Sequence, residues 1–181
     1  ATAKKYIQSA VNLVPPIVNH AVTINVSAGT YRDAGATGSN VYIANKHVGA
    51  GGSITLIGDE TTPANVRVTG ADVDPTPSRN FAFLIDNVKN VAIRGFLCNY
   101  YVSYAISYAN YASGSPRNCV CSSSYAGIAY NDYSSGQPNS CVSTNNTQFG
   151  LLVNSHSYAY PSSCTFNSNA YGLACMYDSV S

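Results

Sequence analysis

From Cys98 onward the chain repeats itself at a period of about 22 residues. Segments 111–130, 133–153 and 158–175 each open on a tyrosine, pass a proline, and reach a cysteine and small polar residues. Each then has an aromatic residue near a glycine, with an aliphatic residue just after it. Two ladders share this period: the cysteines Cys98, Cys119, Cys141 and Cys164, and the aliphatic residues Ile106, Ile128, Leu151 and Leu173. Such a period marks a solenoid, propeller or array, in which each repeat buries its apolar face by stacking on its neighbours.

The repeat unit is built from short strands. Only three to five residues separate the turn clusters, and β-branched or aromatic residues alternate, as in Ile128-Ala129-Tyr130. A leucine-rich repeat is excluded because its regularly spaced leucines are missing. The pattern predicts an all-β fold, a parallel β-solenoid whose coils lie about 4.8 Å apart with like residues stacked.

Composition limits the classes of partner. Only 9% of the 181 residues are charged, against about 25% in an ordinary soluble domain. We therefore expect a surface of Ser, Asn, Thr and Tyr. The net charge of +1 gives no electrostatic case for binding nucleic acid or an anionic membrane. No apolar run reaches about 18 residues, so we expect no membrane span.

We expect a single domain in two parts. Residues 1–31 form an N-terminal capping helix and a first strand, and residues 32–181 form the coils, beginning with a loop over residues 32–52. The helix is predicted within residues 1–20, because apolar residues follow helical spacing until two prolines end the pattern. The chain stops in mid-pattern, and a solenoid needs its terminal coil covered. We therefore expect either a piece of a larger protein or an end covered by another subunit.

Four segments before the repeats resemble a known family. The order IQSAVNLVP, VTINVSAGTYRD, GSITLIGDETTPANVRVTG and NVKNVAIRGFLC resembles the N-terminal part of right-handed parallel β-helix proteins of the pectin lyase-like superfamily. The resemblance covers roughly residues 5–98 by motif and residues 98–181 by repeat period. It implies right-handed coils behind a short capping helix. The superfamily contains pectate lyases, polysaccharide hydrolases, phage tailspikes and passive surface-binding proteins, so the resemblance implies architecture more than activity.

The six cysteines allow three interpretations. They stack as reduced thiols inside the core, or at least one disulfide joins neighbouring coils, or some of them bind a metal. The spacing of Cys119 and Cys121 places both sulfurs on one face of a strand, but no histidine is nearby in sequence. We therefore expect no metal site and no cofactor. The redox state stays open for Cys98, Cys119, Cys121, Cys141, Cys164 and Cys175.

The candidate catalytic residues are two carboxylates, Asp132 and Asp178. Hydrolysis of a glycoside uses two carboxyl groups a few ångströms apart, and these are the only acids in the clear repeats. They lie two coils apart, about 9.6 Å at 4.8 Å per coil, which is wide for a retaining pair and at the edge for an inverting one. For pectate lyases the resemblance implies acids that bind calcium and a Lys or Arg base. The later coils have no lysine and only Arg117, so the chain departs from that pattern.

The candidate ligand-binding residues are tyrosines and aspartates. Tyr111, Tyr133 and Tyr158 stand beside Ser/Gly turns and are expected to face outward, where they would stack on sugar rings or pack against another copy. Asp72 and Asp74 have arginines in the neighbouring segments and form either a sugar or cation site or the ion pairs that hold a loop in place. We interpret Tyr125, Phe149 and Tyr171 as stacked core aromatics and His20, His47 and His156 as surface or turn residues.

Two function classes follow from these features. The first is a non-catalytic β-helix module of an extracellular or virion appendage, tailspike-like or a surface fibre, structural and glycan-binding, that assembles with itself; the resemblance to tailspikes implies a trimer. The second is a polysaccharide lyase or glycoside hydrolase of the same fold. Sparse acids and short turns in the later coils favour the first. A third, weaker class is a secreted cell-wall protein, because two glycosylation sequons begin at Asn25 and Asn145.

Overall fold

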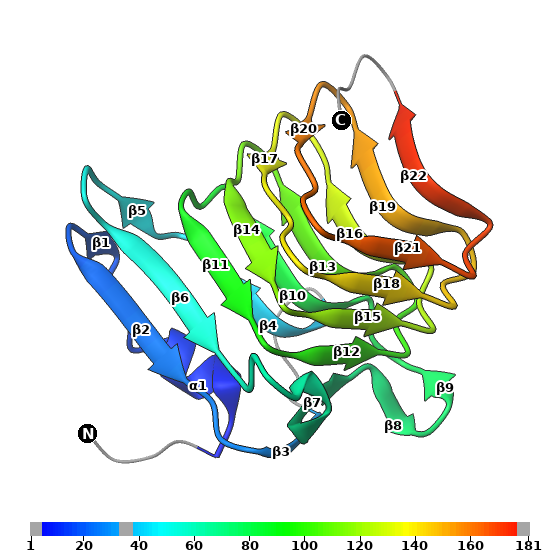
Figure 1. The fold of residues 1–181 in the computed structure, drawn as a ribbon. Coiled ribbons are helices and arrows are strands. Elements are labelled where there is room, and N and C mark those ends of the chain that lie inside the picture. Colours follow the sequence, from blue (N-terminus) through cyan, green and yellow to red (C-terminus); the bar gives the residue numbers. More distant parts are fainter. Residues whose placement is uncertain (1–4, 33–37, 177–181) are drawn as a thin grey trace.

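The computed structural model describes residues 5–32 and 38–176, and in them nearly every strand pairs in parallel with its neighbours. The strands form three main sheets, stacked from α1 (Ile7–Val11) and β2 at one end to β22 at the other (Figure 1). The chain visits the three sheets in one fixed order and returns to the first in the next coil. The all-β class is thus confirmed, with an architecture compatible with a solenoid-like fold.

Each sheet takes one strand from each coil. Sheet 1 contains β2 (Ala21–Asn25), β6 (Ser53–Ile57), β11 (Val91–Arg94) and β14 (Gly114–Arg117). Sheet 2 contains β3 (Gly29–Tyr31), β7 (Val66–Thr69), β12 (Leu97–Asn99), β15 (Val120–Ser122), β18 (Val142–Thr144) and β21 (Thr165–Asn167). Sheet 3 contains β4 (Ser39–Ile43), β10 (Phe81–Asp86), β13 (Tyr104–Ala109), β16 (Ala126–Tyr130), β19 (Phe149–Asn154) and β22 (Tyr171–Met176).

The remaining elements are short. Parallel pairs join β1 (Ile17–Val18) to β5 (His47–Val48) and β17 (Ser135–Gly136) to β20 (Tyr158–Ala159). The antiparallel pair β8 (Ala71–Val73) and β9 (Thr76–Pro77) leaves the stack, and a 3-10 turn, η2 (Pro63–Asn65), precedes β7. An isolated bridge between Ser113 and Ser135 connects β17 to the edge of sheet 1, so β17 and β20 carry this face into the last two coils.

The aliphatic ladder is confirmed, and the cysteine ladder is wrong at one position. Ile106, Ile128, Leu151 and Leu173 are direct partners across β13, β16, β19 and β22. Cys98 pairs with Cys121 rather than with Cys119. Phe96 occupies the position of Cys119 in the preceding coil, because Leu97 pairs with Val120. A phenylalanine fills the same interior volume there, so the period continued while the residue type changed.

Corners between sheets use residues in the left-handed conformation, either one or two in succession. After sheet 3 these residues are Asn87, Asn110, Asp132 and Ser155, with φ between 53° and 55°. Asn and Asp tolerate this conformation better than other residues with a Cβ, because their short polar side chains hydrogen-bond locally. The abundance of Asn and Ser in the chain therefore follows from its repeated sharp corners.

The interior of the coils is apolar, with a few buried tyrosines whose hydroxyl groups are satisfied. Tyr108 and Tyr130 stack with ring centroids 5.0 Å apart, and their hydroxyls donate to the carbonyls of Val91 and Gly114. The interpretation of Tyr125 and Tyr171 as core aromatics is wrong: they are 40% and 58% exposed. They belong to an aromatic column on the outer face of sheet 3.

The N-terminal part differs from the expected loop over residues 32–52, because β4 and the short strand β5 both lie within it. Residues 32–52 contain β4, the first strand of sheet 3, whose Ser39 and Asn40 are buried. Asn40 accepts a hydrogen bond from the hydroxyl of Tyr101, at 2.7 Å. Polar residues inside a strand carry no hydrophobic alternation, so the sequence pattern missed it. The helix α1 is also shorter than predicted, but its Ile7 and Val11 pack into the core.

Candidate functional site

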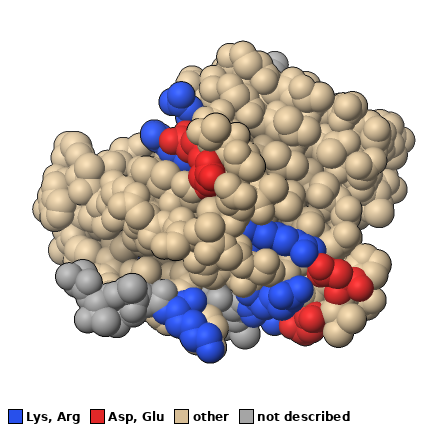
Figure 2. Space-filling view, turned by 60° about the horizontal axis from the view of Figure 1, so that its bottom comes forward, with Lys and Arg blue, Asp and Glu red and all other residues tan. Residues whose placement is uncertain are grey.

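Charged side chains gather in a few places, and most of the surface in view is uncharged (Figure 2). Asp72 pairs with Arg79 at 2.7 Å, which holds the pKa of that carboxyl below its usual range. Asp74 pairs with Arg67 at 2.7 Å and with Arg32 at 3.7 Å. These ion pairs hold the β8–β9 excursion against the coils, which leaves both carboxylates already engaged.

The two candidate catalytic acids are not brought together within the described residues. Asp132 is exposed at the left-handed corner after sheet 3, and its carbonyl accepts a hydrogen bond from the amide of Tyr111. Asn110 and Ser155 occupy the same corner in the neighbouring coils. Asp178 lies outside the described residues. Asp132 thus stands at a position that the coil geometry gives to turn-forming residues.

Tyr111, Tyr133 and Tyr158 are all exposed, but they do not form one column. The rings of Tyr111, Tyr133 and His156 stack in succession, with centroids 5.0 Å apart and planes within 7°. Both faces of the Tyr133 ring are therefore covered by its neighbours, and only its edge is free for a ligand. Tyr158 lies elsewhere, beside Tyr160 at a centroid distance of 6.0 Å and a tilt of 54°.

A groove runs along sheet 1 over the later coils. It consists of two adjoining hollows of about 430 and 280 Å³ that share Ser115, Gln137 and Tyr160. Its floor follows the ladder of the coils, because Arg94 pairs with Arg117 and an isolated bridge joins Arg117 to Asn139. The groove therefore presents one row of outward side chains from each of several consecutive coils.

The side chains of the groove are mostly uncharged hydrogen-bonding groups. The two hollows are lined by Asn90, Ala92, Arg94, Ser113, Gly114, Ser115, Arg117, Ser135, Gly136, Gln137, Pro138, Asn139, Tyr158, Tyr160 and Ser162. Tyr158 and Tyr160 are 47% and 53% exposed, and their rings are tilted rather than stacked on one another. Open aromatic faces beside amide and hydroxyl groups suit a ligand that has both apolar faces and many hydroxyls.

Two arginines add positive charge to this groove. Arg117 lies 3.6 Å from Glu60, both partly exposed. Arg94 has a buried Nε without a hydrogen-bond partner among the described residues. A buried donor of this kind costs free energy unless it is paired, so Arg94 Nε is an unsatisfied donor at the groove.

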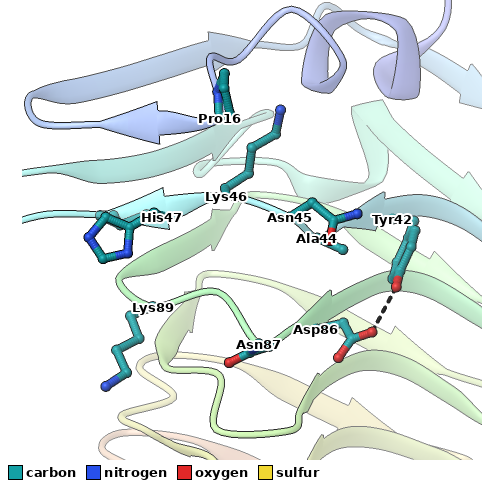
Figure 3. Close-up of a pocket in the computed structure, with 10 residues that line it drawn as sticks. Pro16, Tyr42, Ala44, Asn45, Lys46, His47, Asp86, Asn87 and Lys89 are labelled. Atoms are coloured by element: carbon teal, nitrogen blue, oxygen red, sulfur yellow. Dashed lines mark hydrogen bonds between the residues drawn. The ribbon is translucent and has the colours of Figure 1, made fainter.

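A second site, a pocket separate from the groove, lies at the corner after sheet 3 in the first two coils. Its volume is about 710 Å³, and its lining comprises Pro16, Tyr42, Ala44, Asn45, Lys46, His47, Val48, Asp86, Asn87 and Lys89. Figure 3 shows Tyr42 and Asp86 at one end of this pocket and His47 and Lys89 toward the other. The pocket is therefore acidic and hydroxylic at one end and basic at the other.

The acidic end of the pocket is already hydrogen-bonded. The hydroxyl of Tyr42 donates to Asp86 Oδ2 at 2.7 Å, and the amide of Asn110 donates to Asp86 Oδ1 at 2.8 Å. The hydrogen bond to Asp86 and partial burial raise the pKa of Tyr42 to about 12. Tyr42 is thus a poor base at neutral pH, and Asp86 is held as an acceptor.

The sequence patterns singled out Tyr158, which lines the groove, but neither site as a whole. Tyr160, Gln137 and Arg94 come together only because residues in consecutive coils stack, and Tyr42 meets Asp86 from 44 residues away. The repeat period was the available signal: adding one period to Ser115 leads to Gln137 and then to Tyr160. No group of three His, Cys, Asp or Glu side chains suited to a metal occurs among residues 5–32 and 38–176.

All six cysteines are free thiols, and four of them, Cys98, Cys119, Cys121 and Cys141, are buried. This arrangement agrees with the interpretation of reduced thiols stacked in the core.

Comparisons with known proteins found no relative for this chain. No protein-family model matches the chain, and searches of curated proteins and of solved structures found no match. Within the described ranges, no helix has the length and apolar character needed to cross a membrane.

Proposed function

We propose that this chain is a right-handed parallel β-helix of the pectin lyase-like type that acts as a non-catalytic module of an extracellular or virion appendage and binds a surface polysaccharide along the groove of sheet 1. The observation that carries the proposal is the groove itself. It follows the coil axis, it is lined by hydroxyl and amide side chains, and it has the open rings of Tyr158 and Tyr160 beside it.

A chain of sugars is the ligand class that these features suit. A polysaccharide presents hydroxyl groups at regular intervals, and the groove offers a row of polar side chains from each coil, about 4.8 Å from the next. Sugar rings have apolar faces that pack on tyrosine rings, while the phenolic hydroxyl hydrogen-bonds with their polar edges. The guanidinium of Arg94 can donate hydrogen bonds to a negatively charged substituent.

The enzyme alternative has less support among the described acids. Asp59 accepts hydrogen bonds from the turn around Asn65, Glu60 pairs with Arg117, and Asp86 is held by Tyr42 and Asn110. Acid–base catalysis on a glycoside uses one carboxylic acid with a raised pKa and a second carboxylate nearby. The lining of neither site contains such a pair, so retention without cleavage is the expected behaviour.

Tyr160→Ala tests the groove. We expect this variant to lose about threefold to tenfold in affinity for the retained polysaccharide, since an aromatic contact contributes about 0.5–1.5 kcal/mol. The measurement is affinity electrophoresis against a panel of neutral and acidic polysaccharides, with reducing ends and the absorbance of unsaturated products followed in parallel.

Tyr133→Ala is the matched control, because Tyr133 is equally exposed but its ring faces are covered by Tyr111 and His156. The proposal is wrong if the folded protein retains none of the polysaccharides, or if both variants lose affinity equally. Release of reducing ends or unsaturated products would establish the enzyme alternative instead.

A further inference from the structure

The pocket of Figure 3 contains several donors that the protein leaves without partners. Lys89, His47, Asn45 and Asn87 line it, and none of their side chains has a hydrogen-bond or ion-pair partner among the described residues. Asn45 and Asn87 are left-handed corner residues of two adjacent coils, and Lys89 follows the second corner by two residues. The coil geometry thus collects ammonium, imidazole and amide N–H groups at one place.

The other charged groups of the pocket are already engaged. The ammonium of Lys46 donates to the carbonyl of Val14. Asp86 receives one hydrogen bond on each carboxylate oxygen, from Tyr42 and from Asn110. The pocket therefore keeps two cations, Lys89 without a partner in the described part of the chain and Lys46 with one hydrogen bond to a neutral carbonyl, together with neutral donors.

The two ends of the pocket offer different chemical groups to a ligand. The His47 and Lys89 end offers donors and positive charge, which favour an anionic group with several acceptor oxygens. The Tyr42 and Asp86 end, on the opposite side in Figure 3, offers oxygens that accept from hydroxyl groups. The volume of about 710 Å³ is far larger than an isolated phosphate requires and falls in the range of small-molecule sites.

We propose that this pocket binds a small hydroxylated compound carrying a tetrahedral oxyanion, a sugar phosphate or sugar sulfate, with the oxyanion at Lys89 and His47 and the hydroxyl groups toward Tyr42 and Asp86. A tetrahedral oxyanion has three terminal acceptor oxygens, which match donors arriving from several directions. A planar carboxylate is best matched by the fork of an arginine, and no arginine lines this pocket.

Isothermal titration calorimetry with glucose 6-phosphate, glucose 6-sulfate, glucuronate and glucose tests the site on the full chain. We expect both tetrahedral oxyanions to bind, and glucuronate and glucose to bind about tenfold more weakly or less. Lys89→Gln should lower the affinity for glucose 6-phosphate by about tenfold, since a charge-assisted hydrogen bond is lost. Lys89 is exposed, so this variant should fold normally.

Two controls make the outcome specific. Lys5→Gln removes the same charge from an exposed lysine outside the pocket and should leave binding unchanged. Asn87→Gly keeps the left-handed corner while removing the amide donor, and it should weaken binding without loss of fold. The inference is overturned if neither oxyanion binds, if glucuronate binds as well as glucose 6-phosphate, or if Lys5→Gln weakens binding as much as Lys89→Gln. Tyr160→Ala should not affect these titrations, so failure of the groove and failure of the pocket are distinguishable.

Discussion

At the residue scale, position in the coil decides what an ionisable side chain does. Asp132 stands at a corner where other coils have Asn110 and Ser155. The left-handed backbone conformation of this corner, which aspartate tolerates, is a sufficient reason for an aspartate at this position. Asp86, two coils earlier, is held by Tyr42 and Asn110 and lines the pocket of Figure 3. The position of a carboxylate in the coil therefore decides whether it forms a corner or accepts hydrogen bonds in a pocket.

Buried thiols and phenols give the folded chain a dependence on alkaline pH. Burial raises the pKa of Cys98, Tyr108 and Tyr130, and a hydrogen bond with Cys98 together with burial raises that of Cys121. In the unfolded chain, thiols and phenols lose protons above about pH 8.5 and pH 10. The folded state then binds more protons than the unfolded state, so the stability present below about pH 8.5 is lost as the pH rises.

We expect the urea midpoint to fall between pH 8 and pH 10.5. Each group that stays protonated only in the folded state contributes about 1.4 kcal/mol per pH unit above its unfolded pKa. Cys121→Ala should flatten this dependence, because it removes one such group. Cys175→Ser should leave the slope unchanged, since Cys175 is exposed. A midpoint that is constant across this pH range would contradict the expectation.

At the scale of elements, the strands of sheet 3 approach the neighbouring coil so closely that glycine is needed at one position. Gly127 in β16, Gly150 in β19 and Gly172 in β22 occupy equivalent places in consecutive coils. A Cβ on Gly127 would overlap Ser143 Oγ, which is buried and donates to the carbonyl of Gly150 at 2.8 Å. A Cβ on Gly172 would meet its nearest neighbour, the carbonyl oxygen of Phe166, at 3.1 Å.

Gly127→Ala should therefore destabilise the fold by about 1–3 kcal/mol, as overpacking of a filled interior does. Gly172→Ala, at the equivalent place in the last described strand, should cost clearly less, because only a small shift of its neighbour is required. Urea denaturation followed by circular dichroism compares the two. Equal midpoints for both variants would show that contact with Ser143 does not limit this position.

At the scale of the whole molecule, we expect the outer face of sheet 3 to mediate self-association. The exposed rings of Tyr125 and Tyr171 lie on it beside Phe149, next to the buried apolar cluster of Ala129, Phe149 and Leu152. Only 9% of the residues are charged and the net charge is +1, and a protein with a net charge near zero associates more readily. The proposed appendage module would bring copies together through this face, as a trimer if it follows the tailspikes that the sequence resembles.

Sedimentation equilibrium tests this assembly. We expect a trimer at micromolar concentration that dissociates when Tyr125 and Tyr171 are both replaced by Lys, because burying two ammonium groups in an apolar interface is costly. Tyr6→Lys, at an exposed tyrosine near α1, serves as the control and should leave the mass unchanged. A monomer at all concentrations would refute self-association, and a different oligomer would correct the number alone.

The repeat period alone predicts a stack of short strands. It put Ile106, Ile128, Leu151 and Leu173 in register, because a stacked repeat buries its apolar residues only if like positions align. It also indicated short strands and the polar corners between them. These features are local or periodic, and each can be read from one coil and its neighbour in the sequence.

The register at Cys98, the strand β4 and the two sites as wholes depend on contacts between coils that the repeat period does not specify. Phe96 occupies a position that has a cysteine in the next coil, and the strands still pair there. In β4 the buried residues include Ser39 and Asn40, so the strand shows no hydrophobic alternation. Tyr42 and Asp86, like Gln137 and Tyr160, meet because adjacent coils place them side by side. Whether an outward side chain lies in a groove or in a stack of rings depends on its neighbours in the coils on either side. Those neighbours are about one repeat away in the sequence, so the residues of one strand do not specify them.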